Sequence, residues 1–163
     1  MKPKLIPKLD FSNGIDQANK TMVVIPTILN SKEKVQELTR KLEVYYLANQ
    51  SKNIYFTLLG DCQESDKQEE DYDQEIMQEG EKLVKELNKK YEKEQEKMPI
   101  FHFIYRKREW NEKEGSFLGW ERKRGMLTQF NQYLLRKNKK SFSYEYLGKS
   151  NKRRNQIYHY SRC

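Results

Sequence analysis

The sequence lacks the features that mark membrane-spanning, disulfide-stabilised and zinc-binding proteins. Among its 163 residues are two cysteines, Cys62 and Cys163, too few for a disulfide framework or a four-ligand zinc site. The longest apolar run, residues 22–29, is interrupted by Pro26 and Thr27 and falls far short of the ~18–20 apolar residues of a spanning helix. No hydrophobic stretch follows the N-terminal lysines, so a secretory signal is not indicated. We expect a cytoplasmic location.

Apolar residues are also scarce, and charge is abundant but uneven. Hydrophobic residues make up 36% of the chain and charged residues 34%, while eleven tyrosines and two tryptophans add burial capacity. This length and composition allow one modest core and hence a single domain. The net charge is +8, but residues 61–100 carry seven basic and 14 acidic side chains, whereas residues 101–163 carry 16 basic and five acidic ones. The basic C-terminal third predicts an anionic ligand, either nucleic acid or a phosphorylated small molecule.

Three short apolar runs predict β-strands, and each is followed by a helical pattern. The runs are residues 22–25, 54–59 and 100–105, continuously apolar as in strands covered on both faces. We expect Pro26-Thr27 to end the first strand and Gly60-Asp61 to end the second. The segment Asn30-Ser31-Lys32-Glu33 offers an N-cap for the first helix, with an acidic residue three positions later. The residues expected to form the buried helix faces are Val35, Leu38, Leu42 and Tyr45, then Ile76, Leu83, Val84, Leu87 and Tyr91, then Trp120, Leu127, Phe130 and Leu134.

Alternation of strand and helix predicts an α/β fold with right-handed crossovers and a parallel sheet of three to four strands. Residues 1–20 are expected to form an irregular leader and residues 21–136 the folded unit. A loop is expected over residues 108–118, before a third helix at residues 119–136. Residues 137–163 are expected to be a basic tail, in which residues 155–160 are a candidate for the start of a fourth strand.

Ligands of open α/β sheets bind outside the carboxyl ends of the strands, near the topological switch point. The first turn of the third helix adds free backbone N–H groups and three cations, an arrangement suited to a diphosphate. An acidic side chain at a neighbouring strand end is suited to accept a hydrogen bond from a base or sugar. The candidate nucleotide-binding residues are Pro26, Thr27, Asp61, Arg106, Arg108, Arg122, Lys123 and Arg124.

Each candidate also has a purely structural interpretation. Pro26 can simply end a strand, and Asp61 can be a turn residue or a helix cap. The three consecutive cations can form an exposed helix face. Trp110 and Trp120 are interpreted as packing anchors rather than sugar platforms, and His102 as a core histidine rather than a base. Asp71-Tyr72-Asp73 is interpreted as helix surface, because a metal-binding pair is expected at a strand end.

Several segments resemble one family. They are Leu9-Asp10-Phe11-Ser12-Asn13-Gly14-Ile15, Thr21-Met22-Val23-Val24-Ile25-Pro26-Thr27, Leu42-Glu43-Val44-Tyr45-Tyr46-Leu47-Ala48-Asn49, Trp110-Asn111 and Gly119-Trp120-Glu121-Arg122-Lys123-Arg124-Gly125. Together they look like the glycosyltransferase region of cyclic β-1,2-glucan synthase. The last segment is long and specific, and the resemblance covers roughly residues 9–135.

The resemblance implies a Rossmann-like nucleotide-sugar transferase of the GT-A type, which transfers glucose from UDP-glucose with inversion to build β-1,2-glucan. In such transferases the end of the first strand and an Asp after the second hold the uridine. A Lys in a Lys-x-Gly-x-Leu segment approaches the diphosphate. Residues 123–127 fit that segment, so Lys123 is the expected diphosphate ligand, with Arg106 or Arg108 as a second candidate.

The sequence departs from the family where a fourth strand would end in D-x-D, which holds Mg²⁺ or Mn²⁺ in the intact enzyme. No such pair and no assignable catalytic base or metal ligand follows, and the parent's inner-membrane helices and phosphorylase-like region do not appear. We therefore expect a truncated, donor-binding fragment that binds UDP-glucose without cofactor and lacks turnover alone. It would depend on the rest of the synthase and on a glucan acceptor.

A rival function is a basic nucleic-acid-binding module. Its nucleic-acid-binding surface would be the basic C-terminal third. Phe142, Tyr144 and Tyr146 would serve there as stacking platforms or, in a purely structural interpretation, form one face of a short hairpin strand. The resemblance outweighs the charge, so we expect no nucleic-acid partner.

Overall fold

The computed structural model describes residues 14–92, 98–135 and 142–146, and it has the predicted α/β architecture. A Rossmann-like unit alternates three parallel strands with helices, as the spacing of apolar runs indicates. In chain order the elements of this unit are β1 (Thr21–Leu29), α1 (Lys32–Ala48), β2 (Ile54–Cys62), α2 (Asp71–Lys90) and β3 (Phe101–Arg106).

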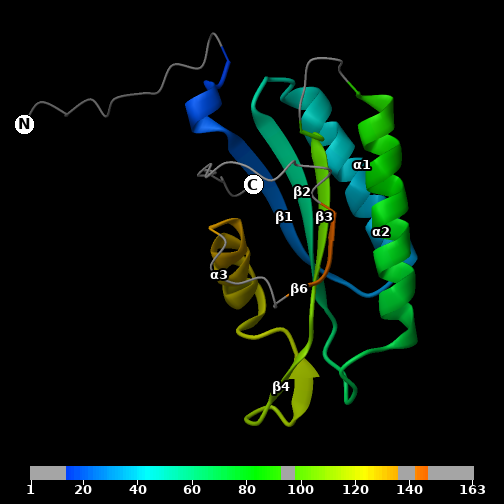
Figure 1. Ribbon diagram of the computed structural model, residues 1–163. Helices are drawn as coiled ribbons and strands as arrows, with labels where there is room; N and C mark the ends of the chain where they lie inside the picture. The colour runs from blue at the N-terminus through cyan, green and yellow to red at the C-terminus, as the bar shows by residue number, and fades with distance from the viewer. Residues whose placement is uncertain (1–13, 93–97, 136–141, 147–163) are drawn as a thin grey trace, which may run out of the picture.

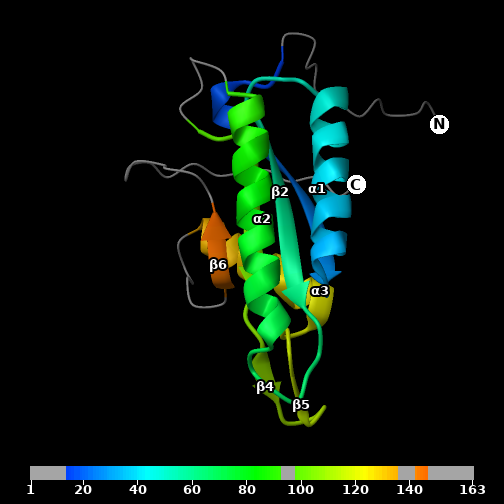
Figure 2. The ribbon, with the colours of Figure 1, turned by 90° about the vertical axis from the view of Figure 1, so that its right-hand side faces the viewer.

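Helices lie on both faces of the sheet. Helices α1 and α2 pack side by side on one face, and α3 (Arg122–Leu134) lies on the other (Figures 1 and 2). Because successive side chains of a strand point to opposite faces of the sheet, Phe56, Leu58 and Phe103 pack toward α1 and α2. The side chains at the alternate positions of the same strands point toward α3. The sheet is therefore buried on both faces, which explains its continuously apolar strands.

Two strands run further than the sequence predicts. Strand β1 continues through Pro26 to Leu29, and β2 continues through Gly60-Asp61 to Cys62. Among the strands described, β1 lies at the edge of the sheet, where proline is tolerated because its missing N–H can face away from the ladder. Asp61 is thus a buried strand residue, and its interpretation as a turn or cap is wrong.

The helices follow the predicted patterns, with two corrections. Ser31 is the N-cap of α1, and its hydroxyl accepts from the N–H of Lys34 at 3.2 Å. The fourth core position of α1 is Tyr46, because Tyr45 lies one residue off the buried stripe and is exposed. Helix α3 begins at Arg122 rather than Gly119, so Trp120 precedes the helix and is not part of its buried face.

The sheet gains a fourth strand within the predicted tail. Strand β6 (Phe142–Tyr146) pairs antiparallel with β3, and Phe142 packs against Tyr133 with ring centroids 5.5 Å apart. This is a strand, as the alternating aromatics indicated, although its partner is β3 rather than an adjacent hairpin strand. The candidate strand at residues 155–160 lies outside the described residues. Within the strands described, the parallel order β1-β2-β3 has no reversal, so the predicted switch point is not found there.

A small hairpin replaces the loop expected at residues 108–118. Strands β4 (Glu109–Asn111) and β5 (Ser116–Leu118) pair antiparallel and project beyond the carboxyl ends of the parallel strands (Figures 1 and 2). Near the start of the described chain, a short 3₁₀ turn, η1 (Gln17–Asn19), lies within the expected leader. Of the helices described, none has the length and apolarity to cross a bilayer.

Candidate functional site at the carboxyl edge of the sheet

A buried ion pair joins the ends of β2 and β3. Nη1 of Arg106 lies 3.3 Å from Oδ2 of Asp61, and the Arg106 side chain is only 1% exposed. Both residues face α3, since they alternate with core residues that pack on that helix. The pair therefore closes the core on the α3 side rather than presenting two free charges to solvent.

The same guanidinium fixes the backbone that leads into α3. Arg106 donates to the carbonyl oxygens of Trp120 and Arg122, the latter at 2.8 Å. Between these acceptors, Glu121 and Arg122 both have φ of +47°, a left-handed conformation that costs energy for residues with a Cβ. At Gly119 a Cβ would overlap the Asp61 carboxylate and lie 2.9 Å from Cζ of Arg106. The loop thus needs glycine, because it crosses directly over the ion pair.

Burial shifts the ionisation of the groups at this edge. It raises the pKa of Asp61, although the Arg106 guanidinium favours the carboxylate, and it lowers the pKa of Arg106. Burial, reinforced by the neighbouring Asp61 charge, raises the pKa of the Cys62 thiol to about 12. Cys62 is therefore a neutral thiol at physiological pH, which makes it a poor nucleophile.

The second predicted arginine belongs to the other face of the sheet. Arg108 is 2% exposed and forms an ion pair with Asp73, at the start of α2. Its Nε donates to the carbonyl of Gln63 at 2.6 Å, and Nη2 donates to the Tyr72 hydroxyl at 2.8 Å. Burial is the largest single influence and lowers the pKa of Arg108, but the hydrogen bond and the charge of Asp73 together outweigh it, so that the pKa is raised. Arg108 therefore links the segment after β3 to the start of α2, and its carboxylate partner is Asp73 rather than Asp61.

The Asp71-Tyr72-Asp73 sequence is only partly helix surface. Asp71 is exposed, but Asp73 is buried and accepts from Arg108, from the Tyr105 hydroxyl at 2.7 Å and from the Glu70 N–H at 2.8 Å. The structural cause is the capping box that Asp73 forms at the start of α2. With these lone pairs occupied, Asp73 does not suit a divalent cation. Across the described ranges no three His, Cys, Asp or Glu side chains gather as metal ligands.

The three cations at the start of α3 are exposed but not equivalent. Arg122 pairs with Glu64 at 3.1 Å, and Arg124 pairs with Glu121 at 2.9 Å. Lys123 has no carboxylate partner among the residues that the structure describes. Since Arg122 lies within reach of Arg106, the structure places the start of α3 beside the Asp61–Arg106 pair. Of the three cations at the start of α3, Lys123 is thus the one whose charge is not paired with a carboxylate among the described residues.

The two candidates on β1 lie on opposite faces of the sheet. Thr27 alternates with Val23 and Ile25, which pack toward α1 and α2, whereas Pro26 alternates with residues that pack toward α3. In the register of β1 and β2, Thr27 stands opposite Gly60, one position before Asp61. Pro26, Asp61 and Arg106 therefore share the α3 face, and Thr27 does not.

Both tryptophans are exposed, so their interpretation as packing anchors is wrong. Trp110 is 54% exposed on β4, and Trp120 is 45% exposed just before α3. Trp110 makes an edge contact with Phe117 across the hairpin, with centroids 5.1 Å apart. The sequence pattern does not reveal this exposure, because it predicts a loop where the β4–β5 hairpin forms and places residue 120 on the buried face of a helix that begins only at Arg122. His102, by contrast, is fully buried in β3 beside Tyr55, as a core histidine should be.

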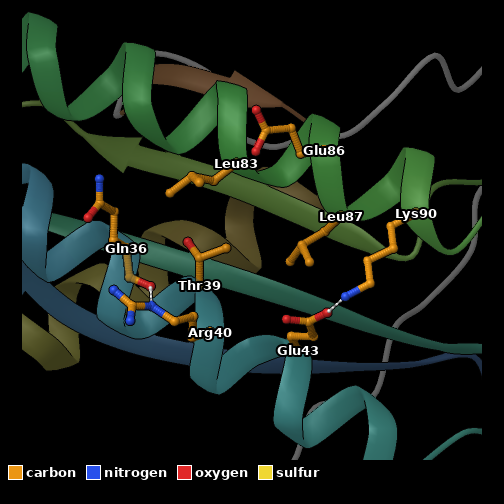
Figure 3. Close-up of a pocket in the computed structure, with 8 residues that line it drawn as sticks. All are labelled: Gln36, Thr39, Arg40, Glu43, Leu83, Glu86, Leu87 and Lys90. Atoms are coloured by element: carbon orange, nitrogen blue, oxygen red, sulfur yellow. Dashed lines mark hydrogen bonds and ion pairs between the residues drawn. The ribbon is translucent and has the colours of Figure 1, made fainter.

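A hollow of about 330 Å³ lies elsewhere, between α1 and α2 (Figure 3). Glu43 and Lys90, both in its lining, form an ion pair of 2.8 Å, and the Thr39 hydroxyl has no hydrogen-bond partner among the described residues. None of the predicted site residues lines this hollow. Its lining residues are Gln36, Thr39, Arg40, Glu43, Leu83, Glu86, Leu87 and Lys90.

Comparison with known proteins identifies a relative. The chain is 36% identical over 133 residues, 82% of its length, to the cyclic beta-(1,2)-glucan synthase NdvB of Rhizobium meliloti. No protein-family model matches the chain. The matched region amounts to 5% of the length of that synthase. The chain is thus homologous to a small region of a cyclic β-1,2-glucan synthase, which confirms the resemblance seen in its motifs.

Proposed function

We propose that this chain is a donor-binding unit of the kind used by a UDP-glucose-dependent, inverting β-1,2-glucosyltransferase. The observation that carries the proposal is its homology to a region of the glucan synthase over 82% of the chain. The Rossmann-like alternation of strands and helices supports it, because folds of this class bind ligands at the carboxyl ends of their strands. On this proposal the chain is part of a GT-A-type transferase domain.

The diphosphate of UDP would lie at the start of α3. Lys123 supplies an exposed ammonium group there, and the first turn of the helix supplies free backbone N–H groups. Residues 123–127 also match the Lys-x-Gly-x-Leu pattern of nucleotide-sugar transferases. Arg106 would act indirectly, by holding the carbonyls of residues 120 and 122 and hence the approach to the helix. The uridine contacts predicted for Pro26, Thr27 and Asp61 stay predictions.

The reaction would be an in-line displacement at the anomeric carbon of glucose. Cations at the start of α3 would stabilise the negative charge that develops on the departing UDP. A carboxylate would deprotonate the acceptor hydroxyl, and no described residue is assigned to that role. Divalent cations would supply further charge neutralisation in the intact enzyme. Since the described residues do not fit a metal, we expect UDP binding here to be weak and independent of Mg²⁺.

Calorimetric titration with UDP and UDP-glucose tests this proposal. Wild-type protein should bind UDP, and Lys123→Ala should weaken binding about tenfold, the effect of losing one charge-assisted contact to phosphate. Lys82→Ala is the matched control, because Lys82 is an exposed lysine on α2, across the sheet from α3. It should bind UDP like the wild type.

Two outcomes would overturn the proposal. One is the absence of UDP binding at millimolar concentration by wild-type protein whose circular dichroism matches an α/β fold. The other is strongly salt-dependent binding of DNA or RNA with no response to UDP, which would favour the nucleic-acid module instead.

A further inference from the structure

The β4–β5 hairpin carries an exposed aromatic surface that the donor site does not use. Trp110 stands on β4 with more than half of its surface exposed, and Phe117 on β5 lies against it edge-on. An exposed indole leaves apolar area in contact with water, and a ligand that covers this area gains hydrophobic free energy. We propose that Trp110 is a stacking platform for a neutral glucan chain, an inference that rests on the proposed transferase function.

The hairpin holds Trp110 rigidly enough to serve as a platform. Trp110 stands opposite Phe117 in the register of the two strands, and the Ser65 backbone exchanges two hydrogen bonds with Phe117, at 2.8 and 3.0 Å. Asn111 accepts from the N–H of Lys113 at 3.0 Å, and Gly115 takes the positive φ that closes the turn. A ligand that stacks here therefore meets a fixed ring and orders little of the chain on binding.

Glucose suits this surface chemically. One face of a β-linked glucose ring presents C–H groups, and the face of an indole carries the negative part of its quadrupole, so the two attract. The rest of the hairpin that carries Trp110 is largely polar: Glu109, Glu112 and Glu114 are exposed, and carboxylates can accept hydrogen bonds from sugar hydroxyls. An exposed aromatic side chain on a hairpin that also carries hydrogen-bonding groups is a typical composition of a recognition surface.

Charge decides between glucan and nucleic acid as the occupant. Residues 109–118 contain three glutamates and one lysine, so the hairpin is net negative although the whole chain carries a net charge of +8. A polyphosphate backbone would be repelled there, whereas a neutral polysaccharide would not. The hairpin also projects at the carboxyl edge, the same end of the molecule as the start of α3 (Figure 1). An acceptor stacked on Trp110 would thus lie on the side of the sheet where the donor is proposed to bind.

The test is an NMR titration of the full chain with neutral, linear β-1,2-linked gluco-oligosaccharides. The Trp110 indole N–H resonance, assigned with Trp110→Phe, should shift on titration of the wild type. Trp110→Ala should weaken binding about tenfold, and Trp110→Phe should weaken it less, because a smaller ring still stacks. Tyr45→Ala is the matched control, since Tyr45 is an exposed aromatic on α1. It should leave glucan binding unchanged.

The outcomes separate this inference from the proposed function. Unchanged UDP binding by Trp110→Ala supports a platform distinct from the donor site. Glucan binding through Trp110 in a chain that fails to bind UDP would uphold the platform while overturning the donor site. Equal glucan affinities of Trp110→Ala and Tyr45→Ala, or no binding by the wild type, would overturn the platform. So would an oligonucleotide that shifts the Trp110 resonance when glucan does not.

Discussion

The residues at the carboxyl edge show how one position can satisfy a sequence pattern and still have a different structural role. Arg106 ends β3 and Arg108 lies two residues beyond it, where diphosphate-binding cations are expected. Each is instead buried against a carboxylate, Asp61 and Asp73 respectively. Removing one partner of such a buried pair leaves an unpaired charge, which typically costs about 3–5 kcal/mol. Loss of ligand binding in Arg106 or Arg108 variants would therefore be ambiguous, and Lys123 is the better residue to test.

The crossing of the chain over the Asp61–Arg106 pair gives a residue-scale prediction. We expect Gly119→Ala to lower the free energy of unfolding by about 1–3 kcal/mol, because its methyl group would overlap the Asp61 carboxylate. Urea denaturation followed by circular dichroism measures the change. Gln50→Ala, at an exposed position after α1, is the control and should stay within about 0.5 kcal/mol of the wild type. Equal stabilities of the two variants would contradict the close approach at Gly119.

Cys62 gives a second prediction at this scale. Burial and the Asp61 charge raise the pKa of its thiol to about 12, so the thiolate is scarce near neutral pH. In a Cys163→Ser background we expect no reaction with Ellman's reagent at pH 8 in native buffer and one thiol per chain after denaturation. Rapid stoichiometric labelling of the native protein would show that Cys62 is accessible and ionised.

At the scale of elements, α1 and α2 are joined by apolar and polar contacts. Tyr46 of α1 lies 4.9 Å from Tyr91 at the end of α2, ring centroid to ring centroid. Just beside it, Glu43 accepts from the ammonium of Lys90 at 2.8 Å and from the Tyr91 hydroxyl at 2.7 Å. Helical spacing alone favoured Tyr45 for the core. In the structure Tyr46 is buried instead, because α2 packs against the face of α1 that carries position 46.

The Glu43 contacts predict a pH-dependent contribution to stability. Hydrogen bonds from Lys90 and Tyr91 lower the pKa of Glu43 below its ordinary value of 4.5. A lowered pKa in the folded state stabilises the protein above about pH 4.5, and this stabilisation is lost as pH falls through the folded-state value. We expect Glu43→Gln to cost about 0.5–1 kcal/mol at pH 7, the range of partly exposed ion pairs, and less at pH 3.

Urea denaturation of wild type and Glu43→Gln at both pH values measures this difference. Glu86→Gln is the control, because Glu86 lines the same hollow between α1 and α2 and has no ion pair among the described residues. Its effect should be small and should not depend on pH. A cost for Glu43→Gln that grows toward pH 3 would contradict the assigned role of the lowered pKa.

At the scale of the whole molecule, the parts with proposed functions gather at one end. The β4–β5 hairpin and the start of α3 both lie beyond or beside the carboxyl ends of the strands (Figure 1). This follows from the parallel sheet, in which every crossover returns the chain to the same edge. The hollow is lined by residues of α1 and α2 (Figure 3). The two binding experiments therefore probe neighbouring surfaces, and the stability experiments probe the framework beneath them.

The sequence by itself determined the order of strands and helices, because their apolar periodicities are local and the parallel sheet is apolar on both faces. It also determined the homology to a glucan synthase region, because the Gly-Trp-Glu-Arg-Lys-Arg-Gly segment is long and specific. Tertiary structure alone decided which charges are paired. Asp61 meets Arg106 and Asp73 meets Arg108 across 45 and 35 positions of sequence, and only the folded sheet brings such partners together. It also decided that Trp110 and Trp120 are exposed, because exposure depends on what the remaining elements cover.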